Sequence, residues 1–255
     1  MRRARKERVG VSVLLLLLTV SAVAMAQTPT PPAAPPPPPP PPHEGTAEFS
    51  FVGTGGNTDT TAFGLSGEFI ARPAPWVFTT RAAFVQNKAD GELKARSFRA
   101  GFRAARTITD RLSAFAEYGY LRDTFAGIED RNAIDGVLSY ILVKPDPHTL
   151  AIEGGLGYAN EKRLFGDDIS TATAFVGAGY KLKLSANADL SDDARFVFSL
   201  SDSDDWRFNN ILAVNAKLAS ILSLKASNIV RYVNAPVIGF DSTDTITSIA
   251  VVAKF

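Results

Sequence analysis

The sequence predicts an all-β protein: a transmembrane antiparallel up-and-down β-barrel of about 12 strands. Three observations lead to this prediction. The chain begins with an export signal, it then alternates apolar and polar residues in segments of about ten, and it ends on an aromatic residue. Although 45% of the residues are hydrophobic, no apolar run after residue 26 approaches the roughly 20 residues that a membrane helix needs. Such alternating segments, separated by turn residues, are typical of strands that cross a membrane.

Residues 1–26 are predicted to be a cleaved secretory signal peptide. Five basic residues lie in 2–8, an apolar run follows in 11–23, and Ala24 and Ala26 supply the small residues of a cleavage site. The alternative is an uncleaved anchor, for which the apolar run is short. Because residues 2–8 hold five basic groups and one acidic group, cleavage changes the formal net charge from +1 to −3. No strong basic patch remains, so we expect no nucleic-acid partner.

Residues 27–44 are predicted to be a Pro-rich periplasmic linker. Eight consecutive prolines occupy 35–42, and proline favours the extended polyproline II conformation. At about 3.1 Å per residue the proline-rich part would reach on the order of 45 Å. We favour a passive spacer over a docking ligand. The mature chain has no cysteine, which excludes disulfides, thiolate metal sites and a lipid anchor on cysteine, and we expect no cofactor.

Residues 45–255 are predicted to form the barrel. The alternation is clearest in residues 62–71, 97–105, 150–159 and 206–218. We expect strands to start near Gly45, Thr60, Trp76, Leu93, Leu112, Asn132, Thr149, Thr171, Ala194, Asp205, Ile221 and Thr243. An even number of strands, as single-chain bacterial barrels have, leaves both ends of the chain on the same, periplasmic side.

The connections are expected to alternate in length. Short turns are predicted at 72–75, 107–111, 144–148, 185–187 and around 219–220. Longer polar loops are predicted at 87–92, 123–130, 160–170, 201–204 and 234–242, and a tight connection at 55–59 is the exception. Outer-membrane barrels have short turns on the periplasmic side and longer loops outside.

Aromatic residues and the last segment favour a membrane barrel over a soluble one. Aromatic side chains near both ends of the strands predict interfacial girdles: Phe69, Trp76 and Tyr180 on the turn side, and Phe84, Tyr120, Tyr158, Trp206 and Tyr232 on the loop side. Ile249, Val251, Ala253 and Phe255 share one face, which is similar to the signal that the barrel assembly machinery reads. We therefore expect a Gram-negative outer membrane, with its lipid, lipopolysaccharide and assembly machinery as partners.

The polar face of the strands carries the best functional lead. The candidates for facing the lumen are Arg81, Arg99, Arg103, Glu117, Glu153, Arg207, Lys217 and Arg231. Rings of Arg or Lys favour anions in pores, so one hypothesis is a narrow, porin-like, anion-leaning channel for small anionic solutes. The alternative is a non-conducting structural or envelope-stress barrel, filled by salt bridges to Glu68, Glu117, Asp135 and Glu153. Twelve strands fall between filled and open barrels, so both hypotheses stay open.

The sequence gives little support for an enzyme. His43 and His148 are the only histidines, and we expect them in the linker and in a Pro-rich turn, away from any nucleophile. An outer-membrane hydrolase is a distant alternative. The acidic pairs 167–168 and 202–205 could attract divalent ions, but no EF-hand spacing is present. We favour solvated loops, with divalent ions as the bridge to lipopolysaccharide, and we predict no metal site within the protein.

Several short motifs in residues 45–255 resemble the family of salt-induced outer-membrane proteins, whose domain has no assigned function. The matching motifs are GNTD at 56–59, DTFAG at 123–127, LAIEGGLGY at 150–158, Arg231-Tyr232, Pro236, Asp244-Thr245 and the final Lys254-Phe255. The resemblance implies an outer-membrane barrel and implies no reaction. The proline tract departs from the family pattern, and residues 184–194 fit it loosely.

Overall fold

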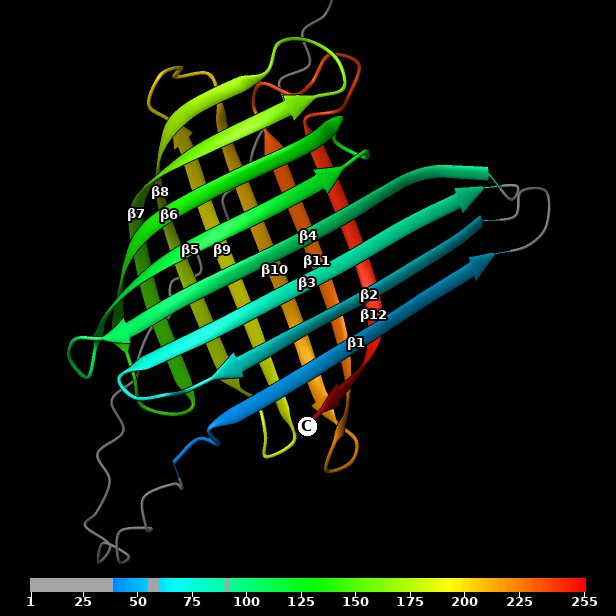
Figure 1. The fold of residues 1–255 in the computed structure, drawn as a ribbon. Coiled ribbons are helices and arrows are strands. Elements are labelled where there is room, and N and C mark those ends of the chain that lie inside the picture. The colour runs from blue at the N-terminus through cyan, green and yellow to red at the C-terminus, as the bar shows by residue number, and fades with distance from the viewer. Residues whose placement is uncertain (1–38, 55–59, 90–91) are drawn as a thin grey trace, which may run out of the picture. The chain divides into compact units, whose positions relative to one another are not determined.

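Twelve antiparallel strands close into a single barrel in the computed structural model, as the sequence predicts (Figure 1). The structure describes residues 39–54, 60–89 and 92–255, so the predicted signal peptide and residues 27–38 of the linker lie outside it. Each strand pairs with the strands before and after it in the chain, and β1 pairs with β12. Within the described part of the chain, no helix is long and apolar enough to cross a membrane.

The strands are 12 to 16 residues long. They are β1 (His43–Thr54), β2 (Thr60–Ala71), β3 (Trp76–Ala89), β4 (Glu92–Thr107), β5 (Leu112–Asp123), β6 (Ile128–Val143), β7 (His148–Arg163), β8 (Ile169–Lys183), β9 (Ala188–Ser199), β10 (Trp206–Lys217), β11 (Leu222–Val233) and β12 (Thr243–Lys254). Most starts agree with the prediction within two residues. The start predicted at Ala194 is wrong by six residues and the one at Asn132 by four, because polar residues at the beginning of β9 and β6 do not interrupt the pairing.

The two ends of the barrel differ in their connections. At the turn end, which also holds the start of β1 and the end of β12, the connections are four residues each: 72–75, 108–111, 144–147, 184–187 and 218–221. At the loop end they range from residues 90–91 to residues 234–242. The long loops predicted at 87–92, 123–130 and 160–170 are wrong in extent. The strands continue through most of these residues, because backbone pairing satisfies their amides whatever the side chains are.

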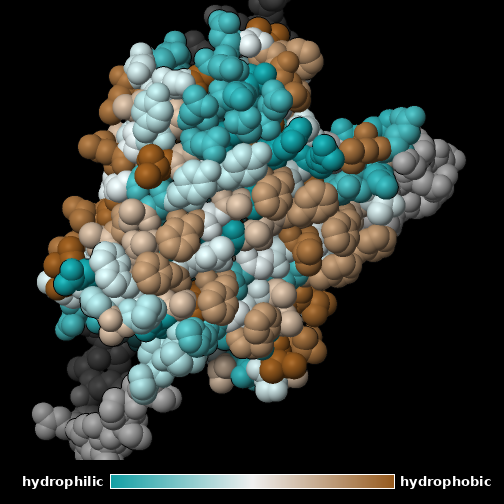
Figure 2. Space-filling model, viewed as in Figure 1, coloured by the Kyte–Doolittle hydropathy of each residue, from teal (hydrophilic) through white to brown (hydrophobic). Residues whose placement is uncertain are grey.

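The outward face of the barrel is apolar over much of its height. Side chains at alternate positions are exposed, among them Phe49 (50%), Leu156 (65%) and Ile249 (64%). Outward aromatic rings pack on neighbouring strands, as Trp206 and Tyr232 do with centroids 4.9 Å apart. Figure 2 shows apolar residues across the wall formed by β1 to β5, with a hydrophilic patch beyond it. So much exposed apolar surface suits lipid and not water.

Part of the inward face is packed rather than polar. Phe115, Val137 and Phe175 form a buried cluster that projects from β5, β6 and β8 into the barrel. Gly155 of β7 makes room for this cluster, since a Cβ atom there would overlap the Phe175 ring. The guanidinium of Arg195 lies 3.7 Å from the centroid of that ring, so a charged layer covers the apolar one.

The barrel closes over a short seam. Residues 46–49 of β1 pair with residues 251–254 of β12, whereas β1 pairs with β2 along its whole length. The backbones of Gly45 and Phe255 exchange two further hydrogen bonds, of 2.7 and 2.9 Å. The Phe255 ring lies over Gly45, where a larger residue would overlap it. Ile249, Val251 and Phe255 are exposed on the outward face of the barrel. Ala253 lies on the same side of β12.

Candidate functional site

Strand register places every predicted lumen residue on the inward face. Arg81 of β3 lies opposite Gly101 of β4, and therefore between Arg99 and Arg103 on the same face. Arg103 in turn lies opposite Glu117 of β5. The same alternation brings the remaining predicted residues inward: Glu153 of β7, Arg207 and Lys217 of β10, and Arg231 of β11. The inward face is thus a ladder of charged side chains.

Ion pairs join these charges, some between neighbouring strands and some across the lumen. The Nε atom of Arg103 donates to Glu117 at 2.7 Å, and Arg81 pairs with Glu68. Arg195 of β9 bridges Glu117 and Asp135, each at 3.3 Å. Three of the four carboxylates expected to form internal salt bridges are therefore engaged. Glu153, the fourth, makes no ion pair within the described residues.

A denser cluster of charges, the loop-end network, lies nearer the loops. It consists of Asp123, Arg131, Glu161, Arg163, Arg207 and Arg231. Glu161 accepts from Arg131 at 2.7 Å, from Arg207 at 2.7 Å and from Arg163 at 2.9 Å. Arg231 of β11 reaches Asp123 of β5, 108 positions away in sequence, at 2.9 Å. The Arg207–Glu161 and Arg231–Asp123 pairs connect strands of the barrel that are not neighbours in the sheet.

The ion pairs of the lumen differ in exposure. The side chain of Arg81 is 53% exposed and that of Glu117 is 21% exposed. Glu161 and Asp123 in the loop-end network are 2% exposed. The lumen is therefore hydrated around Arg81 and tightly packed around the loop-end network.

The longest loop covers the loop end. In residues 234–242, Val237 is buried and the Phe240 ring packs on Phe165 of the β7–β8 loop, with centroids 6.4 Å apart. Gly127 of the β5–β6 loop has φ of +70° and lies so close to both that a Cβ atom there would overlap Phe240 and Val237. Three loops thus interlock above the network.

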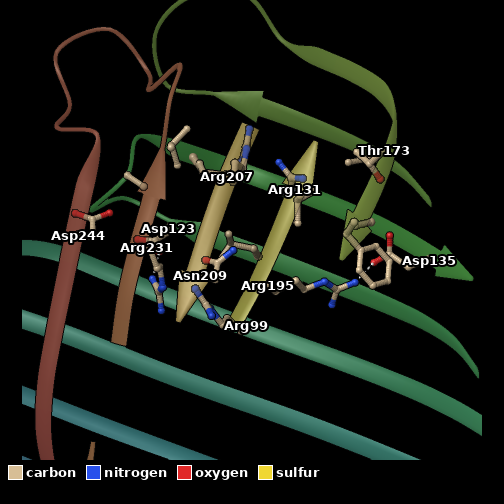
Figure 3. A pocket seen from close by; sticks show the side chains of 18 residues that line it. Arg99, Asp123, Arg131, Asp135, Thr173, Arg195, Arg207, Asn209, Arg231 and Asp244 are labelled. Carbon is tan, nitrogen blue, oxygen red and sulfur yellow. Dashed lines mark hydrogen bonds and ion pairs between the residues drawn. The ribbon is translucent and has the colours of Figure 1, made fainter. Parts of the chain in front are cut away.

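A cavity of about 210 Å³ lies beneath these loops (Figure 3). Its charged lining consists of five arginines and three aspartates: Arg99, Arg131, Arg195, Arg207, Arg231, Asp123, Asp135 and Asp244. Arg99 differs from the other four arginines, because no carboxylate of the described residues lies within 4.0 Å of it. It therefore contributes a positive charge that no ion pair balances.

The histidines and the acidic loops lie away from this cavity. His43 and His148 are the first residues of β1 and β7, which corrects the placement of His43 in the linker and of His148 in a turn. The His148 ring stacks on Tyr180, and its Nδ1 atom is 2.7 Å from the tyrosine hydroxyl. Asp168 accepts a hydrogen bond from the backbone amide of Arg163 at the end of β7, and Asp202 accepts one from Asp204 in the same loop. Over the described residues, no three His, Cys, Asp or Glu side chains are grouped as a metal site.

Sequence reasoning missed several charged residues of the cavity and the network. Asp123, Arg131, Glu161 and Arg163 fall in or beside segments predicted as loops, and Asp244 was seen only as part of a motif. A signal was present for Glu161, since it continues the inward alternation of Glu153, Gly155, Gly157 and Ala159. No comparable signal shows which residues meet across the lumen.

Comparison with known proteins supports the fold. A family model described as "Protein of unknown function, DUF481" matches residues 47–255. The COG4313 outer membrane channel from Pseudomonas putida F1 is similar in structure, with a TM-score of 0.51, 8% identity, and coverage of 84% of this chain and 95% of that chain. The NanC porin has a TM-score of 0.48 and 9% identity, covering 83% of this chain and 97% of that chain. At 8% identity, the similarity to the outer membrane channel shows the fold alone. No curated protein matches the sequence.

Proposed function

The chain belongs to the DUF481 family of proteins of unknown function, and for this member, which has the fold of outer-membrane β-barrels, we propose a narrow channel for small anionic solutes. The observation that carries the proposal is the cavity inside the barrel, lined by five arginines and three aspartates, in which Arg99 forms no ion pair with any described residue. Arginine side chains along a pore favour anions because they lower the electrostatic cost of moving a negative charge through it.

The width of the passage follows from the packing of the interior. The cluster of Phe115, Val137 and Phe175 fills one side of the lumen. The loop-end network and residues 234–242 narrow the lumen at its loop end. Solvent reaches the paired charges near the turn end, where Arg81 is half exposed. We therefore expect a conductance well below that of a wide porin.

A second candidate is a non-conducting structural barrel. The cross-lumen pair of Arg231 and Asp123, and the three arginines around Glu161, favour it because they stabilise the interior and occupy the path of a solute. The two candidates differ in whether the loop end opens.

Single-channel recording in planar bilayers tests the proposal. We expect small, anion-selective currents from refolded protein. Lys162→Glu is the control for charge reversal of lumenal arginines such as Arg99 and Arg103. Lys162 is an exposed side chain at the loop end, so its charge change should leave ion selectivity unaffected. Flat traces from protein whose folding is established by a heat-dependent gel shift would exclude the channel and leave the structural barrel.

A further inference from the structure

We propose that the cavity holds a discrete binding site for a small oxyanion, the carboxylate or phosphate group of a solute, with Arg99 as its principal ligand. The site is the place where an anion would pause inside the channel, and in that sense the inference rests on the proposed function. Whether an oxyanion binds is nevertheless a separate question from whether ions flow.

The observation behind the inference is a set of hydrogen-bond donors without acceptors. Within the described residues, four buried side-chain polar atoms lack a partner: Nε of Arg99, Nε of Arg195, Nη2 of Arg207 and Nε of Arg231. All four belong to arginines that line this one cavity. An unpaired buried donor is unfavourable, and buried polar groups in folded proteins nearly always have partners. A ligand that carries only acceptors, such as an oxyanion, is the kind of partner that these arginines lack.

Among these four arginines, Arg99 is the one that lacks a carboxylate partner. Arg195, Arg207 and Arg231 each have a carboxylate partner as well as a free donor. Arg99 has none among the described residues, and the repulsion that it experiences from Arg231 is larger than the attraction from Asp123. An oxyanion next to both guanidiniums would replace this repulsion with attraction, and each planar guanidinium can bind a carboxylate or phosphate through two parallel hydrogen bonds.

The size and charge of the cavity restrict the ligand. About 210 Å³ is less than the roughly 300–1,000 Å³ of pockets for drug-sized ligands, so the group inside must be small. Asp244 also lines the cavity and makes no ion pair among the described residues, so it would repel an anion. The same carboxylate limits how tightly the site can hold its ligand, which suits a solute that has to leave again.

Calorimetric titration of detergent-refolded full-length protein tests the site. The probes are inorganic phosphate and, in a second arm, acetate, each at constant ionic strength. We expect saturable binding of at least one probe to the native chain. Arg99→Gln should weaken that binding at least about tenfold, equivalent to about 1.4 kcal/mol. Arg99→Lys should retain part of it, and Asp244→Asn should strengthen it severalfold.

The outcomes separate the site from the channel. Lys162→Gln, which removes a positive charge outside the lumen, should leave binding unchanged. Equal binding by Arg99→Gln and the native chain, or no binding of either probe, would overturn the site even if the barrel conducts. Binding that depends on Arg99 in a barrel that passes no current would support the site and exclude the channel.

Discussion

Replacement of Glu161 by glutamine should destabilise the barrel strongly. The substitution keeps the shape of the side chain and removes its charge at the centre of three arginines. Arg131 and Arg163 would each lose their only ion-pair partner among the described residues, whereas Arg207 would keep Asp205 at 3.4 Å. Because the Glu161 side chain is only 2% exposed, water cannot reach the arginines to compensate for the lost charge unless the network opens. Removal of one partner from a buried ion pair costs roughly 3–5 kcal/mol, and we expect a loss in that range.

Denaturant unfolding of the refolded barrel in detergent measures this loss. Glu68→Gln is the matched control, because the Glu68–Arg81 pair lies in the same lumen but is solvent-exposed, and such pairs contribute about 1 kcal/mol or less. A second substitution, Arg131→Gln in the Glu161→Gln background, should recover part of the stability by removing an uncompensated charge. A loss below about 1 kcal/mol for Glu161→Gln would refute the reasoning, since it would mean that the arginines find other partners.

Three further predictions concern selectivity, closure and the loop cover. The double substitution Arg99→Glu and Arg103→Glu should lower the ratio of anion to cation permeability severalfold, measured as a shift of reversal potential in a salt gradient; an unchanged ratio would contradict an anion-leaning lumen. Phe255→Ala should slow the appearance of the heat-modifiable folded form, because the ring that covers Gly45 at the seam is lost; native-like refolding kinetics would argue against that contact. Val237→Asp should release residues 234–242 for limited proteolysis, because it places an unpaired charge at a buried position, and continued protection would mean that other contacts hold the loop.

Much of the fold was predictable, because a barrel strand needs only the local alternation of side chains. The starts of β2, β3, β5 and β12 at Thr60, Trp76, Leu112 and Thr243 agree with the prediction, since each follows a clear turn signal. Alternation fails as a guide at the beginning of β9. There Asp192 lies on the outward face, hydrogen-bonded to Asn210 at 2.6 Å, so polar residues occupy both faces and the segment looks like a turn.

The candidate site was predictable only in part. The inward position of Arg99 and Arg103 follows from their spacing along one strand, and the Arg103–Glu117 pair follows from the order of neighbouring strands. The Arg231–Asp123 contact does not, because it depends on the stagger of the strands around the barrel, which no local pattern encodes. The unpaired state of Arg99 is likewise a property of the assembled lumen.

The difference in exposure between the Arg81–Glu68 pair and the loop-end network has a consequence in concentrated electrolyte. The Debye length falls from about 10 Å at 0.1 M salt to about 3 Å at 1 M, which screens charges in contact with solvent far more than charges shielded by protein. Mobile counter-ions should therefore weaken the attraction between Arg81 and Glu68, while the contacts around Glu161 and Asp123 persist. At high salt, the side-chain contact between β2 and β3 at Glu68 and Arg81 should weaken, and the loop-end network should stay intact.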